Sequence, residues 1–328
     1  MTKAQVSPQW IKSEQCSTVI VFLNNSLDHS LALLIDEKDV VAAIKFLTDS
    51  LRVAKDNATE YQWSTELIPL ARNHLISKFI YECPLTLHSL SRPRGYPGDA
   101  ELLDLIYAHQ SVLHRIESAS EIGRAIFEVT SNVSACEAVR VRRQIVATYL
   151  DEVVAKYPEA ELMSLACGHF REAELSQGLK SGRIKSLFAL DQDEFSLQSV
   201  ELYKKINANI FPRKISVRNI LADKHDLGTH HFIYSAGLYD YLSDNIALRL
   251  TSKLFDLLKS GGTLLLANFL CDIWESSYME AYMNWQLIYR NEAAIWRFAE
   301  EIDSEQIASL TYVVDSTGCV GYLEIVRA

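Results

Sequence analysis

The chain lacks the cysteine patterns that mark zinc sites and disulfide frameworks. Its six cysteines are scattered over 328 residues, and no two of them form a CxxC pair. His225, His230 and His231 lie close together in the sequence but show no third-ligand spacing for a metal. The sequence therefore predicts reduced thiols, a cytoplasmic location and no metal site.

An excess of positive charge is also missing. The 32 Lys and Arg residues are outnumbered by 42 Asp and Glu residues, which gives a formal net charge of −10. A nucleic acid or an anionic membrane is repelled by such a protein on average. We expect a small-molecule substrate and no nucleic-acid partner, and a homodimer remains open.

Long apolar runs are absent from the first thirty residues. Lys3, Lys12, Glu14 and Asp28 interrupt the short apolar stretches there. This pattern matches neither a secretory signal nor a membrane-spanning helix, so we expect no membrane insertion.

The N-terminal part has the periodicity of amphipathic helices. Between residues 30 and 90 apolar side chains recur at spacings of three and four, as in Val40, Ile44, Leu47 and Leu51. We predict a helical N-terminal or lid domain over residues 1–125.

The stretch SRPRGYPGDAELLDLIY follows these helices. Its prolines and glycines indicate an ordered loop, and Asp99 is placed to cap the helix after it. Arg94, Tyr96 and Asp99 of this loop are candidate catalytic residues, with Arg94 the first choice to bind an anionic substrate.

The rest of the chain alternates short apolar runs with amphipathic segments. This alternation predicts an α/β fold with a Rossmann-like, seven-stranded, mostly parallel sheet. The short link Asp315-Ser316-Thr317-Gly318 leaves no room for a crossover helix, so the last strand should be antiparallel. The domain is predicted over 126–328, and its strands over 162–166, 186–190, 215–220, 232–236, 263–267, 312–314 and 322–326.

The loop after the first predicted strand is a candidate ligand turn. Ala166, Cys167 and Gly168 are small residues that let backbone N–H groups approach a ligand closely, and Arg171 follows in the same loop. The fingerprint GxGxxG is absent, which disfavours a dinucleotide relative to a nucleoside that carries an amino acid. A plain tight turn is the alternative.

An acidic residue ends the second predicted strand. Asp191 lies where a carboxylate can accept hydrogen bonds from both hydroxyls of a ribose, and Gln192 follows it. The alternative is that Asp191 or Asp193 merely caps the next helix.

Two further strand ends complete the candidate site. Ser235 and Gly237 end the fourth predicted strand and should contact the cofactor, whereas Tyr239 and Tyr241 would form an aromatic, substrate-facing wall with a catalytic role. Packing as core aromatics is the alternative for both tyrosines. Asn219 and Ile220, at the end of the predicted third strand, are candidates to contact an adenine.

The order of these elements resembles the class I S-adenosylmethionine-dependent methyltransferases, over roughly residues 130–328. A narrower resemblance is to bacterial proteins that make 3-hydroxypalmitic acid methyl ester, and it rests on RPRGYPGDAELL, NVSACEAVRVRRQ, LACGHFREAEL, SAGLYDYLSD and NWQLIYR. The chain departs from the resembling family at His169 and Phe170. The resemblance implies S-adenosyl-L-methionine as cofactor and methyl transfer to a small molecule.

The acceptor remains open between three hypotheses. A carboxylate is already ionised at neutral pH and needs mainly a cationic clamp, whereas an amine acceptor has to lose a proton. The first choice is O-methylation of a carboxylate such as a hydroxy fatty acid. N-methylation of an amine-bearing metabolite and a non-catalytic S-adenosylmethionine-binding regulator are the alternatives. Replacing Asp191 by Ala is expected to abolish cofactor binding and leave the fold intact.

The segment ESSYMEAYMNWQLIYRNEAAIW is rich in aromatic residues at helical spacing. It predicts one helix, serving either as an aromatic wall for the substrate or as a packing surface.

Overall fold

The computed structural model describes residues 8–328, with side chains from Thr18 onward. The described chain divides into two compact units, one of residues up to Cys136 together with Trp274–Gln286, and one of Glu137–Ile273 together with Leu287–Ala328. The predicted boundary between residues 125 and 126 lies inside α9 (Glu121–Thr130). The structure thus assigns a second, C-terminal segment to the helical unit.

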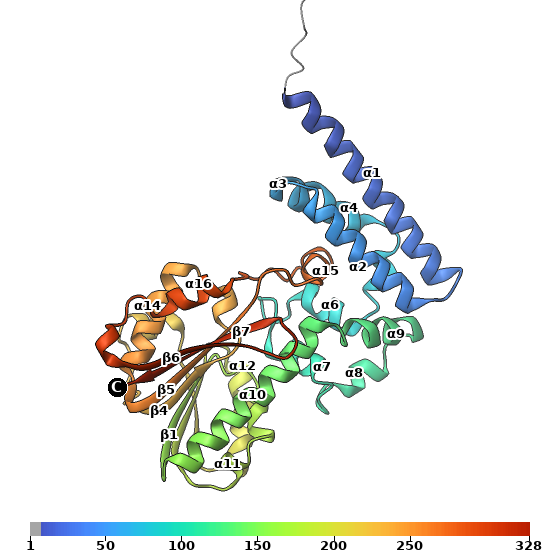
Figure 1. The fold of residues 1–328 in the computed structure, drawn as a ribbon. Helices are drawn as coiled ribbons and strands as arrows, with labels where there is room; N and C mark the ends of the chain where they lie inside the picture. Colours follow the sequence, from blue (N-terminus) through green and yellow to red (C-terminus); the bar gives the residue numbers. More distant parts are fainter. Residues whose placement is uncertain (1–7) are drawn as a thin grey trace, which may run out of the picture. The chain divides into compact units, whose positions relative to one another are not determined.

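The first unit is helical, as predicted. Helix α2 (Val40–Asp56) begins where the Asp39 side chain accepts the N–H of Ala42, and it buries Ile44 and Leu47. Helix α1 (Pro8–Ile35) runs beside it (Figure 1). The other helical segments of the unit are α3 (Glu60–Gln62), the π-helical turn η1 (Trp63–Leu67), α4 (Ile68–Asn73), α5 (Ser77–Ile80), α6 (Pro84–Ser91), α7 (Ala100–Ile106), α8 (Leu113–Glu117), α9, the start of α10 (Ser134–Lys156) and α15 (Ser276–Ala281).

One stretch of α1 is long and apolar enough to cross a membrane, judged by length and composition alone. Within the part of the chain whose side chains are described, it is Thr18–Ile35, and 33% of this stretch is buried. The sequence prediction concerned the first thirty residues, whereas this window extends beyond them to Ile35. A core helix of a soluble protein and a signal sequence near an N-terminus meet the same criteria.

The segment Trp274–Gln286 is packed into the helical unit by buried polar contacts. The carboxylate of Glu280 accepts hydrogen bonds from Lys55 Nζ at 2.6 Å and from Trp63 Nε1 at 2.7 Å. The prediction of one long helix here was wrong, because α15 ends at Ala281 and Asn284 adopts a left-handed φ of 51°. The carbonyl of Met283 then accepts a hydrogen bond from Ser89, so the chain is held out of the helix.

The second unit contains the predicted α/β sheet (Figure 1). Its seven strands lie in the order β3-β2-β1-β4-β5-β7-β6, and β7 runs in the opposite direction to the other six. The fold-class prediction is therefore confirmed, including the antiparallel last strand. The strands are β1 (Ala160–Leu165), β2 (Ile184–Asp191), β3 (Ile210–Lys214), β4 (His230–Ser235), β5 (Leu258–Phe269), β6 (Ile307–Val314) and β7 (Val320–Arg327).

Helices and 3₁₀ turns link these strands. They are α10, η2 (Arg171–Glu174), α11 (Gln177–Lys180), α12 (Glu194–Glu201), η3 (Leu202–Lys205), α13 (Val217–Leu221), η4 (Tyr239–Tyr241), α14 (Asp244–Asp256), α16 (Glu292–Trp296), η5 (Arg297–Ala299) and η6 (Ser304–Gln306). Buried side chains of β1, β4 and β5, such as Met163, Ile233 and Leu264, form one core cluster with Leu250 of α14.

The predicted third strand was wrong in position. The strand is Ile210–Lys214, and the predicted residues 215–220 run into helix α13. Ser216 and Asn219 form a reciprocal capping box that starts this helix. Pro212 lies in the strand itself, which is tolerated because β3 is at the edge of the sheet.

Candidate functional site

The order of the strands fixes where a ligand site belongs. The chain builds β1, β2 and β3 outward on one side and then returns to add β4 on the other side of β1. In open sheets of this kind a ligand binds beyond the carboxyl ends of the strands, at this change of direction. The relevant residues therefore follow Leu165, Asp191 and Ser235.

The turn after β1 has an unusual backbone. Ala166, Gly168 and Phe170 have φ values of 55°, 53° and 57°, and only glycine adopts this left-handed region without a steric penalty. The N–H of Cys167 donates to Leu190 O at 3.0 Å, which ties the turn to β2. Phe170 is one of the two positions at which the chain differs from the family that it resembles. It is 1% exposed, so it contributes to packing.

Asp191 holds this turn. Its Oδ2 accepts the N–H of Gly168 and its Oδ1 accepts the N–H of Asp193, both at 2.9 Å. Burial raises the pKa of the Asp191 carboxyl. The helix cap is a different residue, because Asp193 accepts the N–H of Phe195 at 3.0 Å and starts α12. Gln192 is exposed between the two acids.

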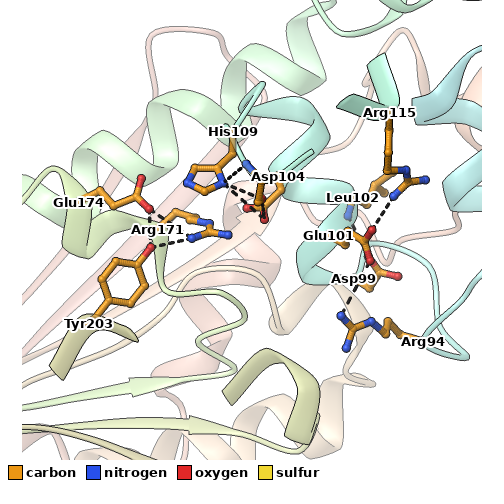
Figure 2. A network of polar contacts seen from close by, with 11 residues as sticks. Arg94, Asp99, Glu101, Leu102, Asp104, His109, Arg115, Arg171, Glu174 and Tyr203 are labelled. Atoms are coloured by element: carbon orange, nitrogen blue, oxygen red, sulfur yellow. Dashed lines mark hydrogen bonds and ion pairs between the residues drawn. The ribbon is translucent and has the colours of Figure 1, made fainter. Parts of the chain in front are cut away.

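Arg171 takes part in a polar network with Tyr203 and Glu174 (Figure 2). Its guanidinium donates to the phenol oxygen of Tyr203 at 2.8 Å and lies 3.2 Å from Glu174 Oε1. The Tyr203 hydroxyl donates to the same carboxylate at 2.5 Å. Burial and this bond raise the pKa of Tyr203.

A cluster of buried charges near the ends of β1 and β4 was missed by the sequence analysis. Arg142 of α10 is 6% exposed and Asp240 is 2% exposed. Glu172 is half-buried and belongs to the same cluster, since burial raises the pKa of both acids and the Arg142 charge opposes that effect in both. The net pKa shift is upward for both, to about 6 for Asp240.

Hydrogen bonds fix the two acids. The Tyr234 hydroxyl donates to Glu172 Oε1 at 2.6 Å, and the backbone N–H of Phe269 donates to Asp240 Oδ1 at 2.6 Å. Glycine at 237 leaves room beside the arginine, because a Cβ there would lie 3.3 Å from an Arg142 nitrogen. The signal in the sequence was a charged residue on the apolar face of α10, three residues after Val139.

The other predicted residues at the end of β4 have separate places. Ser235 is buried and donates to Leu165 O at 3.2 Å, which joins the ends of β4 and β1. Tyr239 is 0% exposed and its hydroxyl bonds Thr251 at 2.9 Å. It packs as a core aromatic, which was the alternative interpretation. Tyr241 is 38% exposed.

Asn219 and Ile220 lie on α13 rather than at a strand end. The Asn219 side chain accepts the N–H of Ser216 at 3.0 Å, and Ile220 is buried in the core cluster. The prediction that placed them at the end of a strand was wrong.

The remaining candidates belong to the helical unit. Asp99 caps α7 by accepting the N–H of Leu102 at 2.8 Å, as predicted, and its carboxylate also bonds His88 Nε2 at 2.8 Å. Arg94 lies 3.9 Å from Glu101 Oε2, and Glu101 Oε1 accepts a bond from Arg115 at 2.6 Å (Figure 2).

Tyr96 is partly buried in the same loop as Arg94. Within the described part of the chain, no three His, Cys, Asp or Glu side chains come together as a metal site. The structure therefore brings Gly168 and Asp191 into direct contact in the sheet unit, and keeps Arg94, Tyr96 and Asp99 on one loop of the helical unit.

Comparison with known proteins gives structural similarity only. No model of a protein family matches the chain, and no curated protein matches it either. The crystal structure of a possible exported protein from Bordetella parapertussis matches 98% of this chain and 99% of its own, with a TM-score of 0.55 and 14% identity. That match shows a shared fold over nearly the whole chain.

Two more distant structures are methyltransferases. The N-methyltransferase NodS from Bradyrhizobium japonicum, in complex with S-adenosylhomocysteine, matches 58% of this chain and 87% of its own (TM-score 0.42, 13% identity). Magnesium protoporphyrin IX methyltransferase ChlM from Synechocystis, with bound S-adenosylmethionine, matches 70% of this chain and 97% of its own (TM-score 0.43, 14% identity).

Proposed function

We propose that this protein is an S-adenosylmethionine-dependent methyltransferase that acts on a small molecule. The observation that carries the proposal is the cluster of Arg142, Glu172 and Asp240 near the strand ends where the sheet changes direction, in which Arg142 and Asp240 are buried and Arg142 lies against Gly237. One cation beside two acids is complementary to a ligand that carries both an anionic and a cationic group. The amino-acid end of S-adenosylmethionine is such a ligand.

The residues present fit this cofactor. Arg142 would bind the α-carboxylate, since a guanidinium pairs well with a carboxylate away from water. Asp240, with a pKa of about 6, is largely ionised at neutral pH and would face the ammonium group with Glu172. Glycine at 237 keeps side-chain atoms away from Arg142.

The nucleoside would lie toward the end of β2. Each oxygen of the Asp191 carboxylate accepts one backbone N–H, from Gly168 or Asp193. A carboxylate has about four lone-pair sites, and the Gln192 backbone N–H also acts on this carboxyl, so one site would remain for a ribose hydroxyl. Gly168 supplies the close backbone approach that a nucleoside requires.

Bound there, S-adenosylmethionine supplies a methyl group whose transfer leaves S-adenosylhomocysteine. The resemblance to proteins that make 3-hydroxypalmitic acid methyl ester favours a carboxylate acceptor, such as a hydroxy fatty acid. An ionised carboxylate needs no base, so positioning would supply most of the rate.

N-methylation of an amine is the second candidate. In this alternative Asp240, a buried carboxyl with a pKa of about 6, would accept the amine proton at neutral pH, and Glu172 alone would face the cofactor ammonium. A non-catalytic S-adenosylmethionine-binding regulator would bind the cofactor and form no product.

The first experiment is calorimetric titration of the purified protein with S-adenosylmethionine and with S-adenosylhomocysteine. Micromolar binding of both supports the proposal, whereas binding of neither by folded, ligand-free protein overturns it. Acceptors are then screened with cofactor labelled in the methyl group. Treating the labelled product with alkali separates the candidates, because an ester is hydrolysed and an N-methyl group survives.

A further inference from the structure

The loop that carries Asp240 is held by one buried arginine from a distant part of the sequence. Arg290 is 2% exposed and lies near the end of β5, where its backbone N–H donates to Phe269 O at 3.1 Å. Nothing in the proposed cofactor contacts accounts for this residue, although NWQLIYR, which ends in Arg290, was one of the motifs singled out in the sequence.

The Arg290 guanidinium binds the backbone on both sides of Asp240. It donates to Tyr239 O at 2.8 Å and to Leu242 O at 2.6 Å. It also donates to Asp244 Oδ1 at 2.8 Å, at the start of α14. The loop is therefore fixed at three points within six residues.

A second set of bonds ties the same loop to the end of β5. Arg290 donates to Asn268 Oδ1 at 2.7 Å, and the Asn268 amide donates to Ile288 O at 3.0 Å. The N–H of Ile288 in turn donates to Asp240 O at 2.7 Å. These bonds hold the backbone around Asp240, and the Phe269 N–H on Asp240 Oδ1 joins its carboxylate to the same network.

We propose that Arg290 is a positioning residue, which sets the place of the Asp240 carboxylate in the site that binds the amino-acid end of the cofactor. This inference rests on the proposed function. A buried guanidinium with several bonds is suited to the task, because it satisfies carbonyl groups that would otherwise be buried without partners.

The network also affects how Asp240 titrates. Burial raises the pKa of Asp240 by more than the charges of Arg142 and Arg290 and the N–H of Phe269 lower it. Removing Arg290 removes one of the lowering effects, so the pKa of Asp240 should rise. The pH midpoint below which cofactor binding weakens should therefore move upward. A residue that only stabilised the fold would leave this midpoint unchanged.

The chain offers a matched control. Arg297 lies 4.0 Å from the other oxygen of Asp244 and is 52% exposed. Arg297→Ala removes a positive charge beside the same carboxylate without touching the network around Asp240. Arg290→Lys keeps the charge but loses the planar arrangement of donors, and it serves if Arg290→Ala fails to fold.

The test is calorimetric titration with S-adenosylhomocysteine between pH 5 and pH 8, with hydrogen exchange at residues 239–242 measured in parallel. We expect Arg290→Ala to weaken binding by about tenfold or more, with its pH midpoint shifted upward, Arg290→Lys to fall between, and Arg297→Ala to match the wild type. Wild-type affinity and midpoint in both Arg290 variants overturn the inference.

Failure of the proposed function is distinguishable from failure of this inference. If the wild-type protein does not bind S-adenosylhomocysteine, the proposed function is wrong and the exchange data decide alone. Faster exchange at 239–242 in Arg290→Ala than in Arg297→Ala then supports the positioning role, and equal exchange refutes it.

Discussion

The carboxylate of Asp191 accepts the backbone N–H of Gly168 at 2.9 Å, across the ends of two neighbouring strands. The same side chain accepts the N–H of Asp193, so a single acid shapes the turn after β1 and the start of the loop after β2. This double role changes what its removal should do.

Asp191→Ala should weaken both the cofactor site and the fold. Two partly buried N–H groups lose their partner, at a cost of about 1–3 kcal/mol in the free energy of unfolding. The sequence analysis expected this variant to keep an intact fold, whereas the structure predicts a loss of stability as well. Asp193→Ala removes the cap of α12, including the bond from the Ser196 hydroxyl, and should cost about 1 kcal/mol. Urea unfolding of both variants measures the difference, and equal losses contradict the role assigned to Asp191.

Arg142→Gln should lower the affinity for S-adenosylhomocysteine by about tenfold to a hundredfold, the worth of a hydrogen bond to a charged group. Binding of 5′-methylthioadenosine, which has no amino-acid group, should stay unchanged. Arg140→Gln, on the same helix but paired with Glu137, is the control. Equal losses for both ligands would show that Arg142 does not read the carboxylate.

Glu280→Gln should destabilise the helical unit. The two oxygens of the Glu280 carboxylate accept hydrogen bonds from Lys55 and Trp63. In a glutamine the NH₂ group replaces one of these oxygens and would face the N–H of Lys55 or Trp63, which cannot accept a hydrogen bond. We expect a loss of about 1–3 kcal/mol and faster hydrogen exchange in 274–286. Glu60→Gln, an exposed change at the start of α3, should leave both unchanged. Unchanged exchange in Glu280→Gln contradicts the anchoring of this segment.

The sheet was predictable because its buried strands are short apolar runs between loops. The edge strand β3 was not predictable in this way. Proline is disfavoured in strands, which hides the strand around Pro212, whereas the β-branched Ile215 and Val217 favour a strand where there is none. The local capping box of Ser216 and Asn219 decides in favour of a helix.

The candidate site was predictable only where it follows a strand end. Gly168 and Asp191 follow β1 and end β2, so the chain order reveals them. Arg142 and Glu172 come together only in three dimensions, from α10 and η2. Tyr239 was predicted as a site residue because it follows the end of β4. Its burial and its hydrogen bond to Thr251 place it in the core instead.

The last prediction concerns His230, which is 1% exposed at the start of β4 with its ring edge-on to Phe188 at a centroid distance of 5.6 Å. Burial lowers its pKa from 6.5 to about 4. In the unfolded chain the imidazole binds a proton below about pH 6.5, whereas the folded protein resists protonation down to about pH 4. The stabilising effect of keeping His230 neutral is thus complete above pH 6.5 and is lost as the pH falls toward 4.

His230→Leu should therefore be less sensitive to acid than the wild type. The shift corresponds to roughly 3 kcal/mol of stability lost between pH 7 and pH 4 through this residue. Asp240 titrates in the same range with the opposite sign, because its folded pKa of about 6 lies above its ordinary value. Only the difference between variant and wild type isolates His230. Urea unfolding at pH 7 and pH 4.5 measures that difference, with the exposed His114→Gln as control. Equal pH dependence in His230→Leu and the wild type would show that this imidazole titrates alike in the folded and unfolded chain.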